Sequence, residues 1–562
     1  MSNFVAPEIK KFAPWDYVVF AALFLVSASI GIFFAIKERK KKSSKEFLVG
    51  GRQMTCGPIA FSLTSSFMSA VTVLGTPSEV YRYGASFILF FLSYTLVIIF
   101  TSELFVPVFY RSGITSTYEL WCFAPSRSLN RSLITHRHGF SMNFFLLQIL
   151  YTGIVVYAPS LALNQVTGFD LWGSVAATGI VCTFYCTLGG LKAVVWTDAF
   201  QMIVMVVGFA TVLIRGTILN GGPTNIWQCA SEGSRLHIFD FDVDPLRRHT
   251  FWTIVVGGAF TWLGLYGVNQ STIQRCISCK SEKHAKLALY LNLLGLWIVL
   301  VCAVFSGLVM YSHYKDCDPW TADFISAPDQ LMPYFVMDIF SSMPGVPGLF
   351  VACAFSGTLS TVAASINALA TVTFEDLVKK FFPDISEKRS TWVSKSLCRY
   401  LGWNRFGSHK IIANLLSPNS PLQRCTLVIS NYLSSISSQG AIGGLLTGIT
   451  LAFWVAIGSF IYPAPSAKAI PLDLSTVGCT LANSTNALTT TAPTTVPARP
   501  LLADTWYSLS YLYFSAIGCL GCAAAGLLIS FATGSFNPKF GFAPEHSSAE
   551  LPVTPHPHPS SS

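Results

Sequence analysis

The sequence is poor in charged residues. Only 11% of its 562 residues are Asp, Glu, Lys or Arg, whereas 52% are hydrophobic and 14% are aromatic. A soluble domain carries roughly a quarter charged residues. No Lys or Arg is expected in the middle of any long apolar stretch. These shortages exclude an ordinary soluble domain and indicate an all-α protein that crosses a membrane many times.

The apolar stretches are long enough to cross a bilayer, which takes ~20 residues for a helix. No cleavable signal peptide is expected, because the first stretch is too long and no basic region precedes it. Together the spans form one transporter domain over 15–533. The expected spans are 15–36, 56–80, 85–110, 140–163, 170–190, 193–215, 251–271, 285–311, 346–373, 440–462 and 505–533.

Basic residues predict the orientation, since Lys and Arg are enriched in cytoplasmic loops. The segment 37–45 after the first span is rich in Lys, which places it inside and the N-terminus, 1–14, outside. The net charge of +9 reflects this bias and gives no argument for nucleic-acid binding. Alternation then places 111–138, Lys192, 275–286, 379–395 and the Pro-, His- and Ser-rich tail 534–562, expected to be disordered, inside.

Two apolar stretches are interrupted by glycine and proline near their middles. The first runs from Ser65 through Gly75 to Pro77, and the second from Gly257 to Asn269. Four spans separate them, so they point in opposite directions. Broken helices in matching positions of two halves are typical of secondary transporters built from inverted repeats. We expect a first repeat at about 56–215 and a second from about 251.

A cluster of hydroxyl residues lies inside the span 346–373. It includes the adjacent Ser360 and Thr361, close to Gly357. Sodium is a hard cation that prefers oxygen ligands, and the carbonyl groups freed by a broken helix would complete its shell. The alternative is that these small residues only allow helices to pack closely in lipid.

Longer motifs resemble the sodium/solute symporter family. They are 66–79 (SFMSAVTVLGTPSE), 189–198 (GGLKAVVWTD), 266–275 (YGVNQ with QR) and 356–376, and the branch they most resemble is that of sodium-coupled monocarboxylate transporters. The resemblance covers about 10–121, 145–398 and 440–530. It implies a leucine-transporter-like five-helix inverted repeat with extra N- and C-terminal spans.

The resemblance also implies functional residues. Sodium, which is co-transported, would be held by carbonyls of Ser65, Met68 and Gly357 and by the hydroxyls of Ser360 and Thr361. Some relatives bind a further sodium at the position of Asp198, but this chain has Ala363 and Ala364 where the additional hydroxyls would be. The substrate cavity would be lined by Phe67, Thr72, Phe90, Phe91, Tyr94, Trp262 and Tyr266, although each aromatic residue could equally be packing.

The implied function is sodium-coupled symport of short monocarboxylates, such as lactate, pyruvate and nicotinate-like acids, across the plasma membrane, apical in epithelia. Because no cationic side chain is expected within the spans, helix termini, hydroxyl groups and sodium itself would attract the acid. An enzyme is not expected, since the polar residues of the spans form no nucleophile–base set and no metal-ligand cluster. Symport of iodide, a vitamin or another small solute is an alternative.

Two segments depart from the family pattern, 122–144 and 399–440. The second is polar and has no run of ~20 apolar residues where the family has most of core helices 9 and 10, so both are expected to be disrupted. A non-transporting or regulatory isoform is therefore a competing interpretation.

Three loops are expected outside: 216–250, 312–345 and 463–504. The last carries Asn483-Ser484-Thr485, an acceptor for glycosylation. Cys229, Cys317 and Cys479 lie in these loops, and their pairing stays open because three is an odd number.

Overall fold

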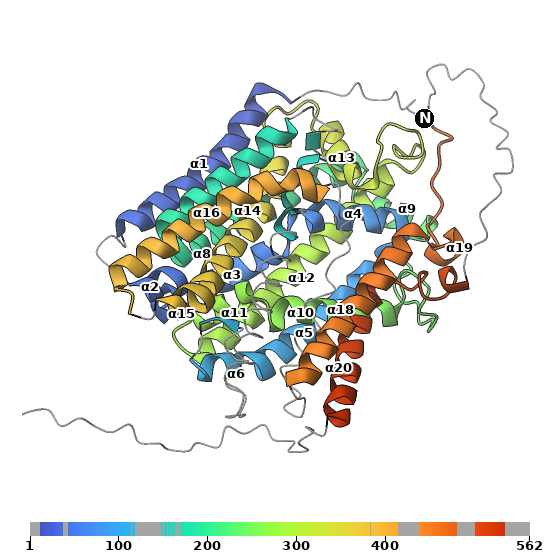
Figure 1. Ribbon diagram of the computed structural model, residues 1–562. Coiled ribbons are helices and arrows are strands. Elements are labelled where there is room, and N and C mark those ends of the chain that lie inside the picture. The colour runs from blue at the N-terminus through green and yellow to red at the C-terminus, as the bar shows by residue number, and fades with distance from the viewer. Residues whose placement is uncertain are drawn as a thin grey trace, which may run out of the picture.

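The computed structural model shows helices running through one bundle (Figure 1). It describes residues 12–37, 43–113, 115–117, 148, most of 151–164, 168, 170–382, 384–413, 438–462, 464–479 and 501–533. Within these residues no strand occurs, and an isolated β-bridge joins Met54 to Cys279. The expected all-α class is therefore confirmed. The calls on 122–144, on Asn483 and on the tail 534–562 lie outside the described residues.

The first half of the chain contributes the helices up to α8. They are α1 (Pro14–Lys37), α2 (Ser44–Val49), α3 (Cys56–Phe67), α4 (Ala70–Tyr83), α5 (Phe90–Phe100), α6 (Val106–Arg111) and α8 (Leu171–Leu219). A 3-10 turn, Ala85–Leu89, precedes α5, and a π-helical turn, Thr101–Phe105, joins α5 to α6.

The second half follows the same pattern of long apolar helices and short connecting ones. They are α9 (Pro223–Glu232), α10 (Gly258–Gly267) with the π-helical turn Thr253–Gly257, α11 (Gln270–Ile277), α12 (Glu282–His313), α13 (Leu331–Ile339), α14 (Val346–Val372) with its π-helical extension Thr373–Val378, α15 (Lys379–Phe381), α16 (Glu387–Ala413), α18 (Ser438–Ile461), α19 (Ser466–Ala469) and α20 (Phe514–Ala532).

Seven of the described helices are long and apolar enough to cross a membrane, and the bent pair α3–α4 would make an eighth span. The expected spans 170–190 and 193–215 are joined in α8, which bends at Gly190, where φ is 58°. A side chain there would meet the carbonyl oxygen of Phe47 at 2.5 Å. Since 49 residues of helix are ~73 Å long, α8 supplies two spans.

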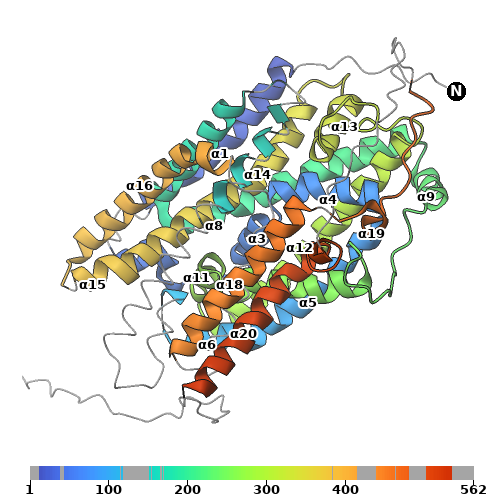
Figure 2. The same ribbon diagram turned by 45° about the vertical axis from the view of Figure 1, so that its right-hand side comes forward.

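The long helix α14 lies at the centre of the bundle (Figure 2). It packs against α8, α1, α3 and α16 and is buried along almost its whole length. At its first turn, buried Asp16 of α1 accepts hydrogen bonds from the backbone N–H groups of Gly345 and Gly348, at 2.8 and 3.0 Å. These contacts fix the axial position of α14 and therefore of its hydroxyl residues.

Two expectations change. Residues 275–286 were expected to form an inner loop, but the first of them belong to a helix, and the polar segment that starts at Arg399 begins as a helix. Arg275 lies in α11, a helix in which all eight residues are buried, because its polar side chains find partners in neighbouring helices. The segment after Arg399 stays helical in α16 as far as Ala413, although α16 is not among the helices apolar enough to span. The rest of the atypical segment, 414–437, lies outside the described residues, so the expected disruption of core helices 9 and 10 stays a prediction.

The connecting segments α9, α13 and α19 gather at one end of the bundle, and α2, α6 and α15 at the other (Figures 1 and 2). At the first end a disulfide joins Cys317 to Cys479, which answers the open question of pairing, and Cys229 is free. Through this bond the segment 464–479 is attached to the loop that follows α12.

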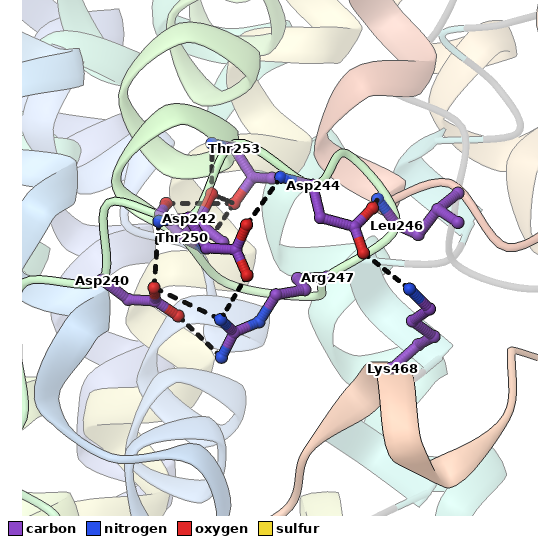
Figure 3. Close-up of polar contacts among 8 residues, drawn as sticks. All are labelled: Asp240, Asp242, Asp244, Leu246, Arg247, Thr250, Thr253 and Lys468. Atoms are coloured by element: carbon purple, nitrogen blue, oxygen red, sulfur yellow. Dashed lines mark hydrogen bonds and ion pairs between the residues drawn. The ribbon is translucent and has the colours of Figure 1, made fainter.

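An acidic run before α10 pairs with two neighbouring cations (Figure 3). Asp240, Asp242 and Asp244 each accept a hydrogen bond from the backbone N–H two residues later. Arg247 pairs with the first two carboxylates and Lys468 with the third, at 2.6–2.8 Å. The pKa of Asp244 is lowered, mainly because its carboxylate accepts a hydrogen bond from Lys468. The run therefore anchors the segment 464–479 to this loop.

Candidate functional site

The first predicted break separates α3 from α4 at Met68 and Ser69. The two helices are bent by 58°. Met68 (ψ 66°) and Ser69 (ψ 169°) leave the helical conformation, and the helix restarts when the Ser69 carbonyl accepts hydrogen bonds from Thr72 and Val73. Pro77 has no N–H to offer to the turn before it, which weakens the start of α4 further.

The second predicted break separates α10 from α11 at Val268 and Asn269. The Asn269 side chain accepts a hydrogen bond from the N–H of Ser271 at 3.2 Å, as the N-cap of the new helix. Both interruptions expected from the sequence are thus present, and at each one a backbone carbonyl accepts from a threonine hydroxyl: Ser66 from Thr361 and Leu265 from Thr272.

Helix α14 meets the first break closely. The Thr361 hydroxyl lies 2.8 Å from the carbonyl oxygen of Ser66 and 2.9 Å from that of Gly357. A Cβ on Gly357 would lie 2.7 Å from the carbonyl oxygen of Met68. Three of the five expected sodium ligands, Met68, Gly357 and Thr361, therefore lie at this approach, and the hydroxyl of a fourth, Ser360, lies 2.6 Å from that of Ser66. The fifth, Ser65, is also buried, but its neighbour Ser66 makes the contact with Thr361.

This donor set suits sodium. Carbonyl and hydroxyl oxygens are the ligands of a hard cation. The single proton of Thr361 can serve only one of its two carbonyl partners at a time, so oxygen lone pairs remain for an ion. Among the described residues no cluster of three His, Cys, Asp or Glu side chains could hold a metal ion.

Asp198 lies beside this set, fully buried in α8. Its Oδ2 accepts a hydrogen bond from Ser62 at 2.6 Å and is 3.9 Å from Nη1 of Arg275, while Ser360 is also close to the carboxylate. Within the described chain its Oδ1 has no hydrogen-bond partner. Gln201, one turn further along α8, is buried, and neither of its amide atoms has a hydrogen-bond partner among the residues that the structure describes.

Sequence reasoning missed Arg275 and Gln201. Gln201 was detectable, because a polar residue three positions after an intramembrane carboxylate lies on the same helix face. Arg275 was not, since a short polar helix after a break has the composition of a loop.

The predicted aromatic residues converge in part. Phe67 stacks on Tyr266 with ring centroids 4.2 Å apart and meets Trp262 at 6.2 Å. Tyr94 meets Trp262 edge to face at 4.7 Å, and Phe90 lies 5.8 Å from Tyr94. These five residues form one aromatic cluster between α3, α5 and α10, next to the first break.

Two predicted residues lie outside this cluster. Phe91 stacks on Trp297 at 4.1 Å and is 38% exposed, because successive helical residues point about 100° apart. Thr72 is half-buried in the first turn of α4, on the other side of the break from Phe67. The structure thus brings Phe67, Phe90, Tyr94, Trp262 and Tyr266 together, and separates Phe91 from them.

A small cavity opens beside the two breaks. Phe67 and Thr361 contribute to its wall, together with residues that sequence reasoning did not select: Ser66, Gln148, Asn269 and Ser365. Gln148 donates a hydrogen bond to Ser365 at 2.5 Å. The cavity therefore has hydroxyl groups of both α3 and α14 on its wall, with the Phe67 ring beside them.

Two interrupted helices that meet a hydroxyl-bearing central helix define a sodium-coupled symporter fold. The solved structure of a Na+-coupled sialic acid symporter, in its substrate-bound outward-open state, has this fold: the TM-score is 0.73 at 17% identity, over 93% of this chain and 98% of that one. The model of the sodium:solute symporter family matches residues 47–448. The chain belongs to that family, and the predicted family and fold class are confirmed.

Individual relatives are much more similar. The chain is 66% identical to the human sodium-coupled monocarboxylate transporter 2 over 537 residues, which are 94% of this chain and 85% of the relative. It is also 66% identical to the mouse protein of the same name over 540 residues, with the same coverage.

Proposed function

We propose that the chain carries short monocarboxylates, such as lactate and pyruvate, across the plasma membrane together with sodium. The names of its relatives support the substrate class, and the contact of Thr361 with the carbonyls of Ser66 and Gly357 supports the sodium site. In this proposal Ser65, Met68, Gly357, Ser360 and Thr361 supply the oxygen atoms, with Asp198 nearby.

The aromatic cluster would hold the acid beside the ion. Phe67, Trp262 and Tyr266 offer an apolar wall for the short carbon chain, with Thr72 near the N-terminus of α4. The carboxylate would lie toward the ion and the helix terminus, where positive charge is available. Each ligand then raises the affinity for the other, which is the reciprocal coupling that symport needs.

The orientation that basic residues favour is part of the same proposal. The N-terminus and the loops with Cys317, Cys479 and Asn483 would face outside, and the C-terminus would face the cytoplasm. Extracellular placement fits the disulfide, since such bonds persist in oxidising surroundings. Loss of a glycan from a chain with Asn483→Gln, seen as a mobility shift, would test this side assignment.

Sodium dependence of uptake tests the function. Labelled lactate uptake by the full chain in cells without another lactate carrier is expected to need sodium. Thr361→Ala should raise the half-saturating sodium concentration more than about tenfold, equivalent to the loss of a charge-assisted contact. Thr211→Ala is the matched control, because Thr211 bonds the preceding turn of its own helix as Thr361 does, but on an exposed face.

Two results would contradict the proposal. Uptake indifferent to sodium would exclude sodium coupling, and no uptake by a chain that reaches the cell surface would favour a non-transporting or regulatory form. The polar composition of α16 is the observation behind that second candidate. Competition by iodide or a vitamin, with no competition by pyruvate, would change the substrate class instead.

A further inference from the structure

A buried arginine connects the inner halves of the two broken helices. Arg275 on α11 is 1% exposed. Its Nη1 donates to the carbonyl oxygen of Ser62 at 2.6 Å, and its Nη2 donates to the hydroxyl of Ser66 at 2.9 Å. These acceptors lie one turn apart on α3, a spacing that the planar guanidinium can bridge with two nitrogens. Arg275 therefore clamps the last turn of α3 before the break.

The charge of Arg275 is balanced by Asp198. Nη1 lies 3.9 Å from Oδ2 of that carboxylate, and the Ser62 hydroxyl donates to the same oxygen at 2.6 Å. Burying either charge alone would be costly, whereas the pair is neutral as a whole. The pair also faces Ser360 on α14, which lies close to the carboxylate. Four helices, α3, α8, α11 and α14, thus meet at one polar group.

The directions of the hydrogen bonds follow from what each group can do. A guanidinium only donates and a carboxylate only accepts. Ser66 must therefore accept from Arg275, and its oxygen lies 2.6 Å from that of Ser360. One arrangement directs all the protons the same way: Arg275 donates to Ser66, Ser66 donates to Ser360, and the Ser360 proton is then left to point toward the nearby carboxylate of Asp198.

We propose that Arg275 is a positioning residue for sodium. Acting through Ser66, it fixes the rotation of the Ser360 hydroxyl, so that the proton points to Asp198 and an oxygen lone pair is left for the cation. Without this chain the Ser360 hydroxyl could turn its proton toward the ion, which repels it. The inference rests on the proposed function, in which Ser360 is a sodium ligand.

Two serines beside the same carboxylate allow a matched test. Ser66→Ala interrupts the chain between Arg275 and Ser360, whereas Ser62→Ala removes a hydroxyl that donates only to Asp198. The readouts are the half-saturating sodium concentration for lactate uptake by the full chain, and the lactate KM at saturating sodium. Ser66→Ala should raise the sodium value about fivefold to tenfold, the range expected for a lost polar contact, with the lactate KM unchanged. Ser62→Ala should change the half-saturating sodium concentration less than about twofold.

Arg275→Lys tests whether the arginine acts through Ser66. Lysine keeps the charge but cannot bridge the Ser62 carbonyl and the Ser66 hydroxyl in the same geometry. The half-saturating sodium concentration should therefore rise. Interacting residues give non-additive effects, and the double variant Ser66→Ala, Arg275→Lys should therefore be no worse than Ser66→Ala alone.

The proposal is overturned if Ser66→Ala keeps the sodium dependence of the unmodified chain, if Ser62→Ala matches Ser66→Ala, or if the effects in the double variant multiply. Should Arg275→Lys fail to reach the cell surface, the comparison of the two serine variants decides. Sodium-independent uptake by the unmodified chain would instead refute the proposed function, and the inference with it.

Discussion

Gly357 faces the carbonyl oxygen of Met68 so closely that a Cβ on the glycine would lie 2.7 Å from it. The next two closest atoms, the N of Ala70 and the carbonyl carbon of Ser69, are backbone atoms at 3.0 Å. No flexible side chain can give way here. The central helix therefore approaches the broken turn only because residue 357 lacks a side chain, and the hydroxyls of Ser360 and Thr361 lie one turn further along.

Gly357→Ala should separate α14 from the break and abolish most sodium-coupled uptake. A shift of even 1 Å would lengthen the contact between the Thr361 hydroxyl and the Ser66 carbonyl oxygen from 2.8 Å to beyond hydrogen-bonding range. We expect uptake at a fixed sodium concentration to fall more than about tenfold at equal amounts of protein on the cell surface. Gly75→Ala is the control, since a Cβ on that glycine meets no atom within 4 Å. Equal uptake by the two variants would contradict the role of close approach.

Asn292→Leu should weaken substrate binding without affecting sodium. Buried Asn292 on α12 donates to the hydroxyl oxygen of Tyr266 at 2.9 Å and lies 2.9 Å from the Thr64 hydroxyl. It thereby holds the ring that stacks on Phe67. Loss of one buried hydrogen bond corresponds to a rise of about fivefold in lactate KM. A KM equal to that of the unmodified chain would show that the Tyr266 ring needs no such support.

The broken helices were predictable because their cause is local. Glycine, proline and a capping asparagine interrupt a helix wherever the chain folds. The angle of a residue around its helix also follows from its place in the sequence. Which face of the helix meets the cavity, however, depends on how the helices pack. This is why Phe90 and Phe91 could not be distinguished in advance, although the structure places only Phe90 in the aromatic cluster.

Arg275 and the disulfide needed tertiary information. The segment Gln270–Ile277 is polar, and it is buried only because Arg275 finds Asp198 and Ser66 while Gln274 donates to the Leu48 carbonyl at 2.6 Å. None of these partners is near in sequence. The same holds for Cys317 and Cys479, which are 162 positions apart.

Reduction of the Cys317–Cys479 bond should destabilise the end of the bundle that carries segment 464–479. The segment also contacts the bundle through hydrogen bonds from Arg235 to the Asp473 carbonyl at 2.7 Å and from Leu472 to the Arg82 carbonyl at 2.9 Å. A disulfide that closes a loop of this length stabilises by about 3–5 kcal/mol. We expect Cys317→Ser to lower the midpoint of thermal unfolding by several degrees, with Cys229→Ser, a free cysteine, as the control. Equal midpoints for both variants would count against this account.

His249 should make the same end of the bundle sensitive to acid. Burial is the main cause that lowers the pKa of His249 to about 4; it outweighs the attraction of Glu79 and is helped by the charge of Arg248. The ring is packed by Tyr83 and Phe87, and its Nε2 lies 3.2 Å from the Tyr511 hydroxyl. A folded-state pKa below the unfolded value of 6.5 means that the stability contribution is complete above pH 6.5 and declines as the pH falls toward 4. At pH 5 the loss would be about 2 kcal/mol.

The measurement is the midpoint of thermal unfolding of the purified chain between pH 7.5 and 5. His249→Gln removes the titrating group and keeps a polar atom near Tyr511, so its midpoint should fall less over this range than that of the unmodified chain. His284→Gln is the control, because His284 lies exposed on the first turn of α12, at the other end of that helix from the disulfide. If both variants and the unmodified chain lost the same stability on acidification, protonation of His249 would not be the cause.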